Sequence, residues 1–217
     1  MTQQTAKSRR NRQRSRTKIL LAAEALFARE GPSASVNDIA ARAGLNKRMI
    51  YHYFGGKEGL WQAVLMRQYE KAAATELDLP EHADLAAIVD LLVRRYYRFL
   101  AEDKHFVRII LHENLRGGRS IRTLPVAATK SPILQALRSA LEKFEKSGQF
   151  SHVLDANQLL IDCLALCFFY FSNQATLSAT IGVDLSRPAQ LQRRIHHVTA
   201  LLKHALSGTL GGPPFRV

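Results

Sequence analysis

The stretch SVNDIAARAGLNKRMIYHYFGGKEGLWQAVL, residues 35–65, decides the fold of this 217-residue chain. Its pattern predicts a short helix over Val36–Ala43, a turn over Gly44–Asn46 and a second short helix over Lys47–Phe54. Gly44 can adopt the left-handed backbone conformation that so short a turn requires. Two short helices joined in this way form a helix-turn-helix, whose second helix enters the major groove of DNA.

Neither short helix has an apolar face wide enough to be stable alone, so flanking helices must complete a small bundle. One flanking helix is expected from about Arg16 to Arg29, stopped by Gly31-Pro32. The other is expected from Lys57 to about Leu77, after Gly55-Gly56 ends the recognition helix.

Three motifs in this region, IA-x-x-AG, Y-x-YF and Lys-Glu-x-Leu, occur together in the same order as in a known family. Residues 16 to about 66 resemble the DNA-binding domain of the TetR family of transcriptional regulators. The resemblance implies a ligand-responsive transcriptional repressor that binds a palindromic operator as a homodimer and is released by a small-molecule effector. It also implies an all-α fold class: an N-terminal three-helix DNA-binding bundle followed by a larger helical ligand-binding and dimerisation domain.

The rest of the chain shows helical periodicity and no persistent strand alternation. Further helices are expected over residues 84–102, 104–115, 132–147, 155–180 and 188–206. The expected organisation is a basic flexible arm at 1–15, a helix-turn-helix domain at 16–66, a ligand-binding and dimerisation domain at 67–208 and a flexible tail at 209–217.

Positive charge is concentrated near the N-terminus. The chain has 31 basic and 18 acidic side chains, and seven of the basic ones lie in residues 1–18, which contain no acid. Such a block favours a polyanionic partner such as double-stranded DNA, although a solvated tail or an anionic membrane surface are alternatives. Residues 3–18 carry no bulky apolar side chain, so insertion into a membrane is not expected.

Composition narrows the class of protein further. Apolar residues make up 47% of the chain, enough for a buried core, and the two cysteines cannot form a disulfide scaffold. The N-terminus has no apolar signal region, and the longest apolar run, residues 159–171, is short for a bilayer and contains Asp162. We therefore expect a cytoplasmic protein with no membrane partner.

Most residues expected to contact DNA lie at the starts of the three helices after residue 34, and Tyr51 and His52 lie together on one side of the second of these helices. Arg48 can pair with guanine in the major groove or contact a phosphate instead. Met49 can touch a thymine methyl group or pack against the first helix, and Ser35 can contact a phosphate or simply cap its helix. Lys57 lies at a helix N-terminus, which favours a phosphate contact. The full predicted set is Ser35, Val36, Lys47, Arg48, Met49, Tyr51, His52 and Lys57, in which the phosphate contact of Tyr51 is implied by the family resemblance.

Most aromatic residues of the second domain are expected to form its core, but a small-molecule pocket would need some of them with polar neighbours. The residues predicted to bind ligand are Tyr97, Phe106, His112, Phe169 and Asn173. The dimer interface is predicted on the last two helices, at Leu191, Ile195, Val198 and Leu202, which share a helical register.

Two other functional classes remain open: a protein that coats DNA without sequence preference, and a helical-bundle enzyme. The enzyme would need a convergent polar site, which the sequence does not show. His196, His197 and His204 have no acid or thiol at ligand spacing, and Cys163 and Cys167 lie in an apolar helix without nearby cations. We therefore expect no catalytic residues, no metal and no cofactor.

Overall fold

The computed structural model of the chain describes residues 3–74, 84–146 and 155–206. Helices dominate these residues and no strand occurs among them, so the predicted all-α fold class is confirmed. Contacts divide the chain into two units. The first unit runs to Lys71 and adds Lys104–Val126, and the second unit contains Ala72–Asp103 and the chain from Ala127 onward. The helix ends predicted near Pro80 and Gly148 and the tail at 209–217 lie outside the described residues.

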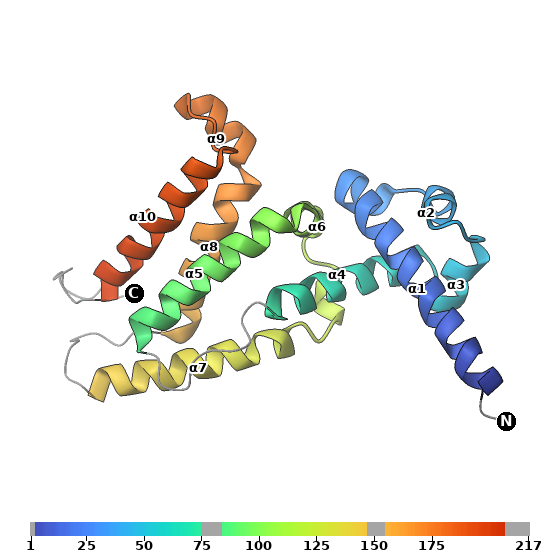
Figure 1. The fold of residues 1–217 in the computed structure, drawn as a ribbon, viewed down its shortest axis with the longest axis horizontal. Coiled ribbons are helices and arrows are strands. Elements are labelled where there is room, and N and C mark those ends of the chain that lie inside the picture. The colour runs from blue at the N-terminus through green and yellow to red at the C-terminus, as the bar shows by residue number, and fades with distance from the viewer. Residues whose placement is uncertain (1–2, 75–83, 147–154, 207–217) are drawn as a thin grey trace. The chain divides into compact units, whose positions relative to one another are not determined.

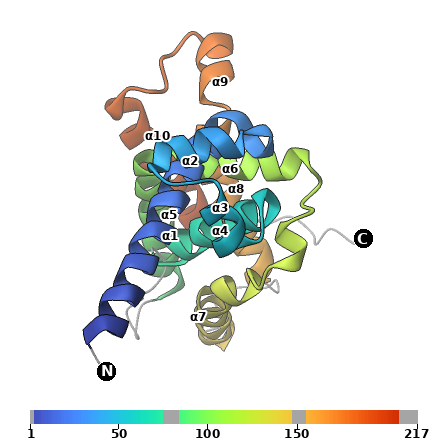
Figure 2. The same ribbon diagram turned by 90° about the vertical axis from the view of Figure 1, so that its right-hand side faces the viewer.

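The first unit is built around one long helix (Figures 1 and 2). It contains α1 (Gln3–Glu30), α2 (Val36–Ala43), α3 (Arg48–Phe54), most of α4 (Lys57–Ala74) and α6 (Lys104–Leu115). The second half of α1 contacts both α2 and α6. Fully buried Phe27 and Trp61 meet edge to face, with ring centroids 5.1 Å apart, so the core joins α1 directly to α4.

The start of α1 differs from the prediction. The helix was expected to begin near Arg16, but it begins at Gln3. Residues 3–15 contain no Gly or Pro and are rich in Arg, Gln and Lys, which have high helix propensity. The side chains of residues 7–14 are all exposed, and Figure 2 shows these turns extending past the other helices of the unit. The predicted arm is therefore helical here, and its flexibility in solution stays a prediction.

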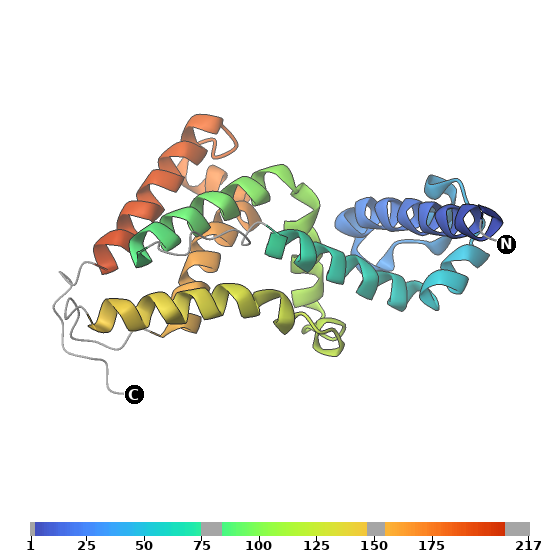
Figure 3. The same cartoon turned by 60° about the horizontal axis from the view of Figure 1, so that its bottom comes forward.

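In the second unit, α5 (Leu85–Glu102) contacts three neighbours. These are α7 (Ala127–Lys146), α8 (Ala156–Ser172) and α10 (Pro188–Leu206). Figures 1 and 3 show α5 and α10 side by side and running in opposite directions. The core between these helices is largely aliphatic and aromatic, with Tyr97 at its centre.

Two predicted helix boundaries in this unit were wrong. The helix expected to open at Pro132 begins five residues earlier, at Ala127, and Pro132 lies inside it. The preceding AATKS segment contains no Gly or Pro, so it can continue the helix in the N-terminal direction. The single helix expected over 155–180 is broken into α8 and α9 (Gln174–Ile181), which are bent by 73°. Asn173 Nδ2 donates to the carbonyl of Phe169, a polar side chain that competes with the helical backbone bonds at the break.

No single helix in the described ranges is long and apolar enough to cross a membrane. The bent pair of α8 and α9 passes the same test of length and composition when the two helices are taken together, and α8 buries much of its surface in the second unit.

Candidate nucleic-acid interface

The helix-turn-helix forms as the sequence predicts. Ser35 caps α2 by accepting a hydrogen bond from the Asn37 backbone N–H at 3.2 Å. Gly44 ends α2 in the left-handed conformation, with φ of 65°, and this reverses the chain within three residues. Buried Ile39 and Ala40 then face the core, so α2 holds the turn and the next helix in place.

The recognition helix, α3, has one buried side and one exposed side. Asn46 Oδ1 accepts from the Arg48 backbone N–H at 2.9 Å and so caps the helix, as predicted. Ile50 is fully buried, and Met49 and Phe54 pack partly against the same core. Met49 therefore packs inward, which supports the second of its two predicted roles. Val36, at the start of α2, packs against this core as well.

The exposed side of α3 carries the polar residues of the predicted set. Lys47, Arg48 and His52 are exposed, and Tyr51 is 56% exposed. Arg48, Tyr51 and His52 follow the spacing of one helical face. The fold thus presents a cation, a phenol and an imidazole together, while the opposite face is fixed by apolar packing.

Lys57 opens α4 and is exposed, as the predicted phosphate contact requires. Gly56 precedes it with φ of 128°, a conformation that side chains rarely adopt. The next residue, Glu58, accepts the Ser120 hydroxyl at 2.6 Å and the Arg116 guanidinium at 3.0 Å. The Ser120 hydrogen bond is the main cause that lowers the pKa of Glu58, and Arg116 adds to it. These contacts fasten the start of α4 to the segment that follows α6.

The basic residues of α1 extend this charged surface. Lys7, Arg9, Arg10, Arg12 and Arg14 are exposed along the first turns. Arg16 lies 5.2 Å from the centre of the Phe54 ring, a cation–π contact that ties α1 to the end of α3. The arm and the recognition helix therefore belong to one folded unit.

Glu24 is a buried carboxylate that the sequence reasoning missed. It accepts from Lys71 Nζ at 2.6 Å and Arg67 Nε at 3.3 Å, both on α4, and lies 3.5 Å from His105 Nδ1 on α6. Its side chain is only 7% exposed. One acid thus links α1, α4 and α6. The sequence pattern that could have identified it is a single charged residue inside the apolar run ILLAAEALF.

Glu113 is a second buried carboxylate of the same unit. It accepts from Trp61 Nε1 at 2.8 Å and from the backbone N–H groups of Ser120 and Ile121 at 2.7 and 3.0 Å. It therefore joins α6 to α4 and also shapes the loop after α6. No local sequence pattern identifies a glutamate whose partners are a distant indole and two backbone donors.

The residues predicted to bind ligand are divided between the units. Phe106 is buried in the first unit, and His112 lies there against Gly31, where a Cβ atom would approach its Nδ1 within 2.6 Å. Tyr97 is buried in the second unit, where it donates to the Leu166 carbonyl at 2.8 Å and accepts from Arg194 at 3.2 Å. Burial is the main cause that raises the pKa of Tyr97.

The two other predicted ligand residues, Phe169 and Asn173, lie near the bend between α8 and α9. Phe169 is 54% exposed, and Asn173 is occupied by backbone and serine contacts. Phe169 and Asn173, like Tyr97, belong to the second unit, whereas Phe106 and His112 belong to the first. Their role in binding a ligand stays a prediction.

The residues named for the dimer interface require a correction. Val198 is fully buried, and Ile195 and Leu202 are at most 8% exposed within the single chain. They lie on the side of α10 that packs against α5 in the second unit, so they are core residues and are not free to meet a second copy. Leu191 is half-buried. Helical register alone could not tell a core stripe from an interface stripe.

The cysteines and histidines considered as redox or metal-binding residues lie in surroundings that do not favour either chemistry. Burial raises the pKa of the Cys163 thiol to about 12 and raises that of Cys167 as well, so both stay protonated and unreactive near neutral pH. His196, His197 and His204 are exposed on α10, and no ligand group forms around them in the described ranges.

Comparison with known proteins agrees with this geometry. Residues 19–64 match the family described as bacterial regulatory proteins, tetR family, and residues 86–202 match the tetracyclin repressor-like C-terminal domain. The HTH-type transcriptional repressor NicS of Pseudomonas putida is 32% identical over 213 residues, covering 95% of this chain and 98% of that protein.

Solved structures share the fold. The transcriptional regulator SCO4942 of Streptomyces coelicolor has a TM-score of 0.67 at 23% identity, covering 88% of this chain and 97% of the other. FadR of Bacillus subtilis, solved in complex with stearoyl-CoA, has a TM-score of 0.61 at 22% identity, covering 86% of this chain and 96% of the other.

Proposed function

The chain belongs to the TetR family of bacterial transcriptional regulators, and we propose that it is a repressor that binds a palindromic operator as a homodimer and is released by a small molecule. The similarity to a protein named as a repressor over nearly its whole length supports the direction of regulation. The observation that carries the proposal is the exposed face of α3, with Lys47, Arg48, Tyr51 and His52 held on a buried core.

Different residues of this surface have different roles in the proposal. Arg48 lies in the first turn of α3, the end of a recognition helix that meets base edges, and its guanidinium can bind guanine through two hydrogen bonds. Lys57 and Tyr51 bind phosphates and set the position of α3 in the groove. Lys47 and His52 flank Arg48 and Tyr51, and Ser35 acts mainly by fixing α2.

The proposed dimer uses the outer sides of α8 and α10. Ile161 and Phe169 on α8 are 52% and 54% exposed, and Leu201 on α10 is 46% exposed. Ile161 and Phe169 are eight residues apart with Ala165 between them, so they lie in one stripe of the helix. α8 and α10 both pack against α5, and large apolar side chains exposed on these two helices favour burial against a partner.

The operator proposal is tested by fluorescence anisotropy with duplexes from the intergenic DNA beside the gene and with scrambled duplexes. Lys57→Ala should weaken binding to every duplex alike and reduce the salt slope by about one unit. Arg48→Ala should remove about 1–3 kcal/mol of discrimination at one base pair. Arg187→Ala is the matched control, because it removes an exposed arginine of the second unit. It should change neither the affinity and its salt slope nor the discrimination between base pairs.

The rival function, coating of DNA without sequence preference, gives a different result in the same experiment. A coating protein would bind operator and scrambled duplexes equally, and Arg48→Ala would then act like Lys57→Ala. The dimer is tested separately by sedimentation of Phe169→Asp, which should dissociate to monomers and lose affinity for the full palindrome. A monomeric variant with full affinity would contradict the dimer.

A further inference from the structure

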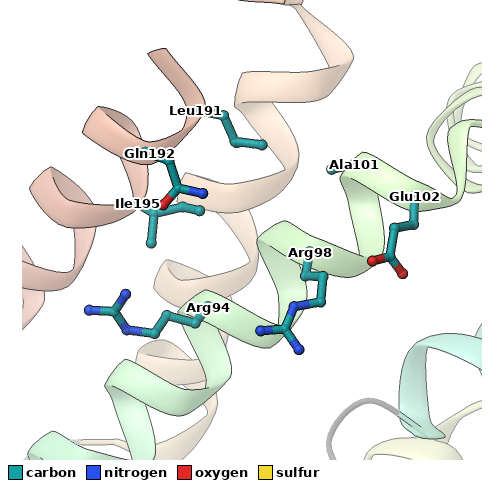
Figure 4. A pocket seen from close by; sticks show the side chains of 7 residues that line it. All are labelled: Arg94, Arg98, Ala101, Glu102, Leu191, Gln192 and Ile195. Atoms are coloured by element: carbon teal, nitrogen blue, oxygen red, sulfur yellow. The ribbon is translucent and has the colours of Figure 1, made fainter. Parts of the chain in front are cut away.

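A groove of about 210 Å³ lies between α5 and α10 in the second unit (Figure 4). Its apolar lining comes from Ala101, Leu191 and Ile195, and its polar lining from Arg94, Arg98 and Glu102 on α5 with Gln192 on α10. The three charged residues follow one another at intervals of four along a single face of α5. The groove therefore joins an apolar wall to a row of charges.

The charges of this row are not equivalent. Arg94 Nε donates to Asp90 at 2.8 Å, and Lys203 Nζ on α10 approaches the same carboxylate at 3.4 Å, so Arg94 belongs to an ion network with these two residues. Arg94 lowers the pKa of Asp90, which keeps the network charged. The guanidinium of Arg94 is thereby committed to an acid within the protein.

Arg98 has no such partner. No carboxylate lies within 4.0 Å of its guanidinium among the described residues, although Glu102 is one helical turn away. In Figure 4 Glu102 lies at the end of the row away from Arg94. Arg98 thus offers a planar fork of hydrogen-bond donors at the middle of the groove.

We propose that the groove between α5 and α10 binds a small amphipathic carboxylate, whose carboxylate pairs with Arg98 and whose apolar part lies against Leu191 and Ile195. Carboxylate oxygens match the guanidinium fork, and a bidentate pair is among the stronger hydrogen-bonding arrangements. In the intact regulator this ligand is the effector. This effector role rests on the proposed function, whereas the binding of a carboxylate to the groove does not.

The binding step is tested by isothermal titration of the full-length protein without DNA, with hexanoate as the probe. Hexanamide has nearly the same shape without the charge and should bind at least tenfold more weakly. Arg98→Gln should weaken hexanoate at least tenfold, whereas Glu102→Gln should strengthen it because it removes a nearby negative charge. Arg187→Gln removes the same charge elsewhere in this unit and should leave the affinity unchanged.

A further variant tests whether hexanoate needs the space of the groove in addition to the charge of Arg98. Ala101→Phe should fill the groove and abolish hexanoate binding while every charge stays in place. Equal binding of hexanoate and hexanamide, or an unchanged affinity in Arg98→Gln, would overturn the proposal. Inorganic phosphate that binds as tightly as hexanoate would overturn the apolar half of it.

The same variants distinguish this site from the proposed function. Arg98→Gln should bind operator DNA as the parent protein does when no ligand is present, because the groove lies in the second unit and α3 in the first. Hexanoate binding that depends on Arg98 but leaves operator affinity unchanged would support the site and contradict its role as the effector site. If the parent protein did not bind operator DNA at all, the proposed function would be contradicted. The hexanoate titration would still decide whether the groove binds a carboxylate.

Discussion

The first unit buries two carboxylates, Glu24 and Glu113, whereas the buried polar side chains of the second unit, within its described part, are neutral. Tyr97, Cys163, Cys167 and Thr199 are the main examples. Each buried glutamate accepts several directed bonds that join α4 to α1 or to α6. The second unit relies on aliphatic and aromatic packing, in which Tyr97 contacts Tyr170 and Phe171 edge to face or tilted.

This difference suits the two tasks in the proposed repressor. A buried carboxylate is held in one position, because its charge destabilises the fold unless every hydrogen-bond donor stays in place. The first unit therefore holds α3 and Lys57 in a fixed arrangement. Apolar packing tolerates changes of similar volume, so the second unit can adapt to a ligand at modest cost.

The largest expected effect is the loss of Glu113. Glu113→Ala removes the acceptor of the Trp61 indole and of two backbone N–H groups, and leaves all three buried without partners. We expect a loss of about 3–5 kcal/mol in the free energy of unfolding, typical for breaking a buried charged network. Urea unfolding followed by tryptophan fluorescence measures it directly, because Trp61 is the only tryptophan of the chain.

The matched control for Glu113 is Glu142→Ala, which removes an exposed glutamate from α7. This variant should unfold within about 0.5 kcal/mol of the parent protein. If both substitutions had similar small effects, the contrast between the two units would have no energetic basis.

Glu24→Gln should have a smaller effect. The amide keeps the size of the side chain but loses the charge that Lys71, Arg67 and His105 approach. Lys71 and Arg67 are 29% and 37% exposed, so water can solvate them when the acid is removed. We expect a loss of about 1–3 kcal/mol in urea unfolding. A loss as large as that of Glu113→Ala would show that water does not relieve these cations.

The helix-turn-helix could be predicted from the sequence because its determinants are local. Ser35, Gly44 and Asn46 act on backbone groups within a few residues, and each does so in the structure. The exposed and buried sides of α3 follow from helical periodicity in the same way. The identity of the DNA-facing residues could thus be proposed before any tertiary contact was known.

The features that were not predicted depend on partners far away in the sequence, or on a polar side chain that competes with the backbone hydrogen bonds of a helix. Glu113 meets Trp61 across 52 residues, and nothing near either residue encodes that pair. The stripe from Ile195 to Leu202 is apolar whether it faces α5 or a second copy. The break at Asn173 arises because a polar side chain competes with a helix that apolar periodicity otherwise favours.

In the second unit, Tyr97→Phe should cost only about 1 kcal/mol. It removes one hydroxyl that donates to the Leu166 carbonyl and accepts from Arg194, and the ring packing stays in place. Because burial raises the pKa of Tyr97, the hydroxyl is protonated throughout the neutral range and the loss should be the same at pH 6 and pH 8. Tyr51→Phe, on the exposed face of α3, is the control and should not alter unfolding. A loss comparable to that of Glu113→Ala would mean that the second unit also depends on a directed polar contact.

The smallest expected effect concerns Glu58, which is 56% exposed at the start of α4. The Ser120 hydroxyl lowers the pKa of this carboxyl in the folded protein, so the contact stabilises the fold above the ordinary pKa of glutamate and is lost as pH falls through the lowered value. Ser120→Ala should therefore reduce the unfolding free energy at pH 7, by less than about 1 kcal/mol because solvent screens an exposed acid. The deficit attributable to Glu58 should shrink on acidification, and a carbon-detected titration should show the pKa of Glu58 rising in the variant. Ser131→Ala, which removes a hydroxyl that donates to the Ala127 carbonyl, should show no such pH dependence. An unchanged Glu58 titration in Ser120→Ala would mean that Arg116, rather than the hydroxyl, holds the carboxyl in its charged form.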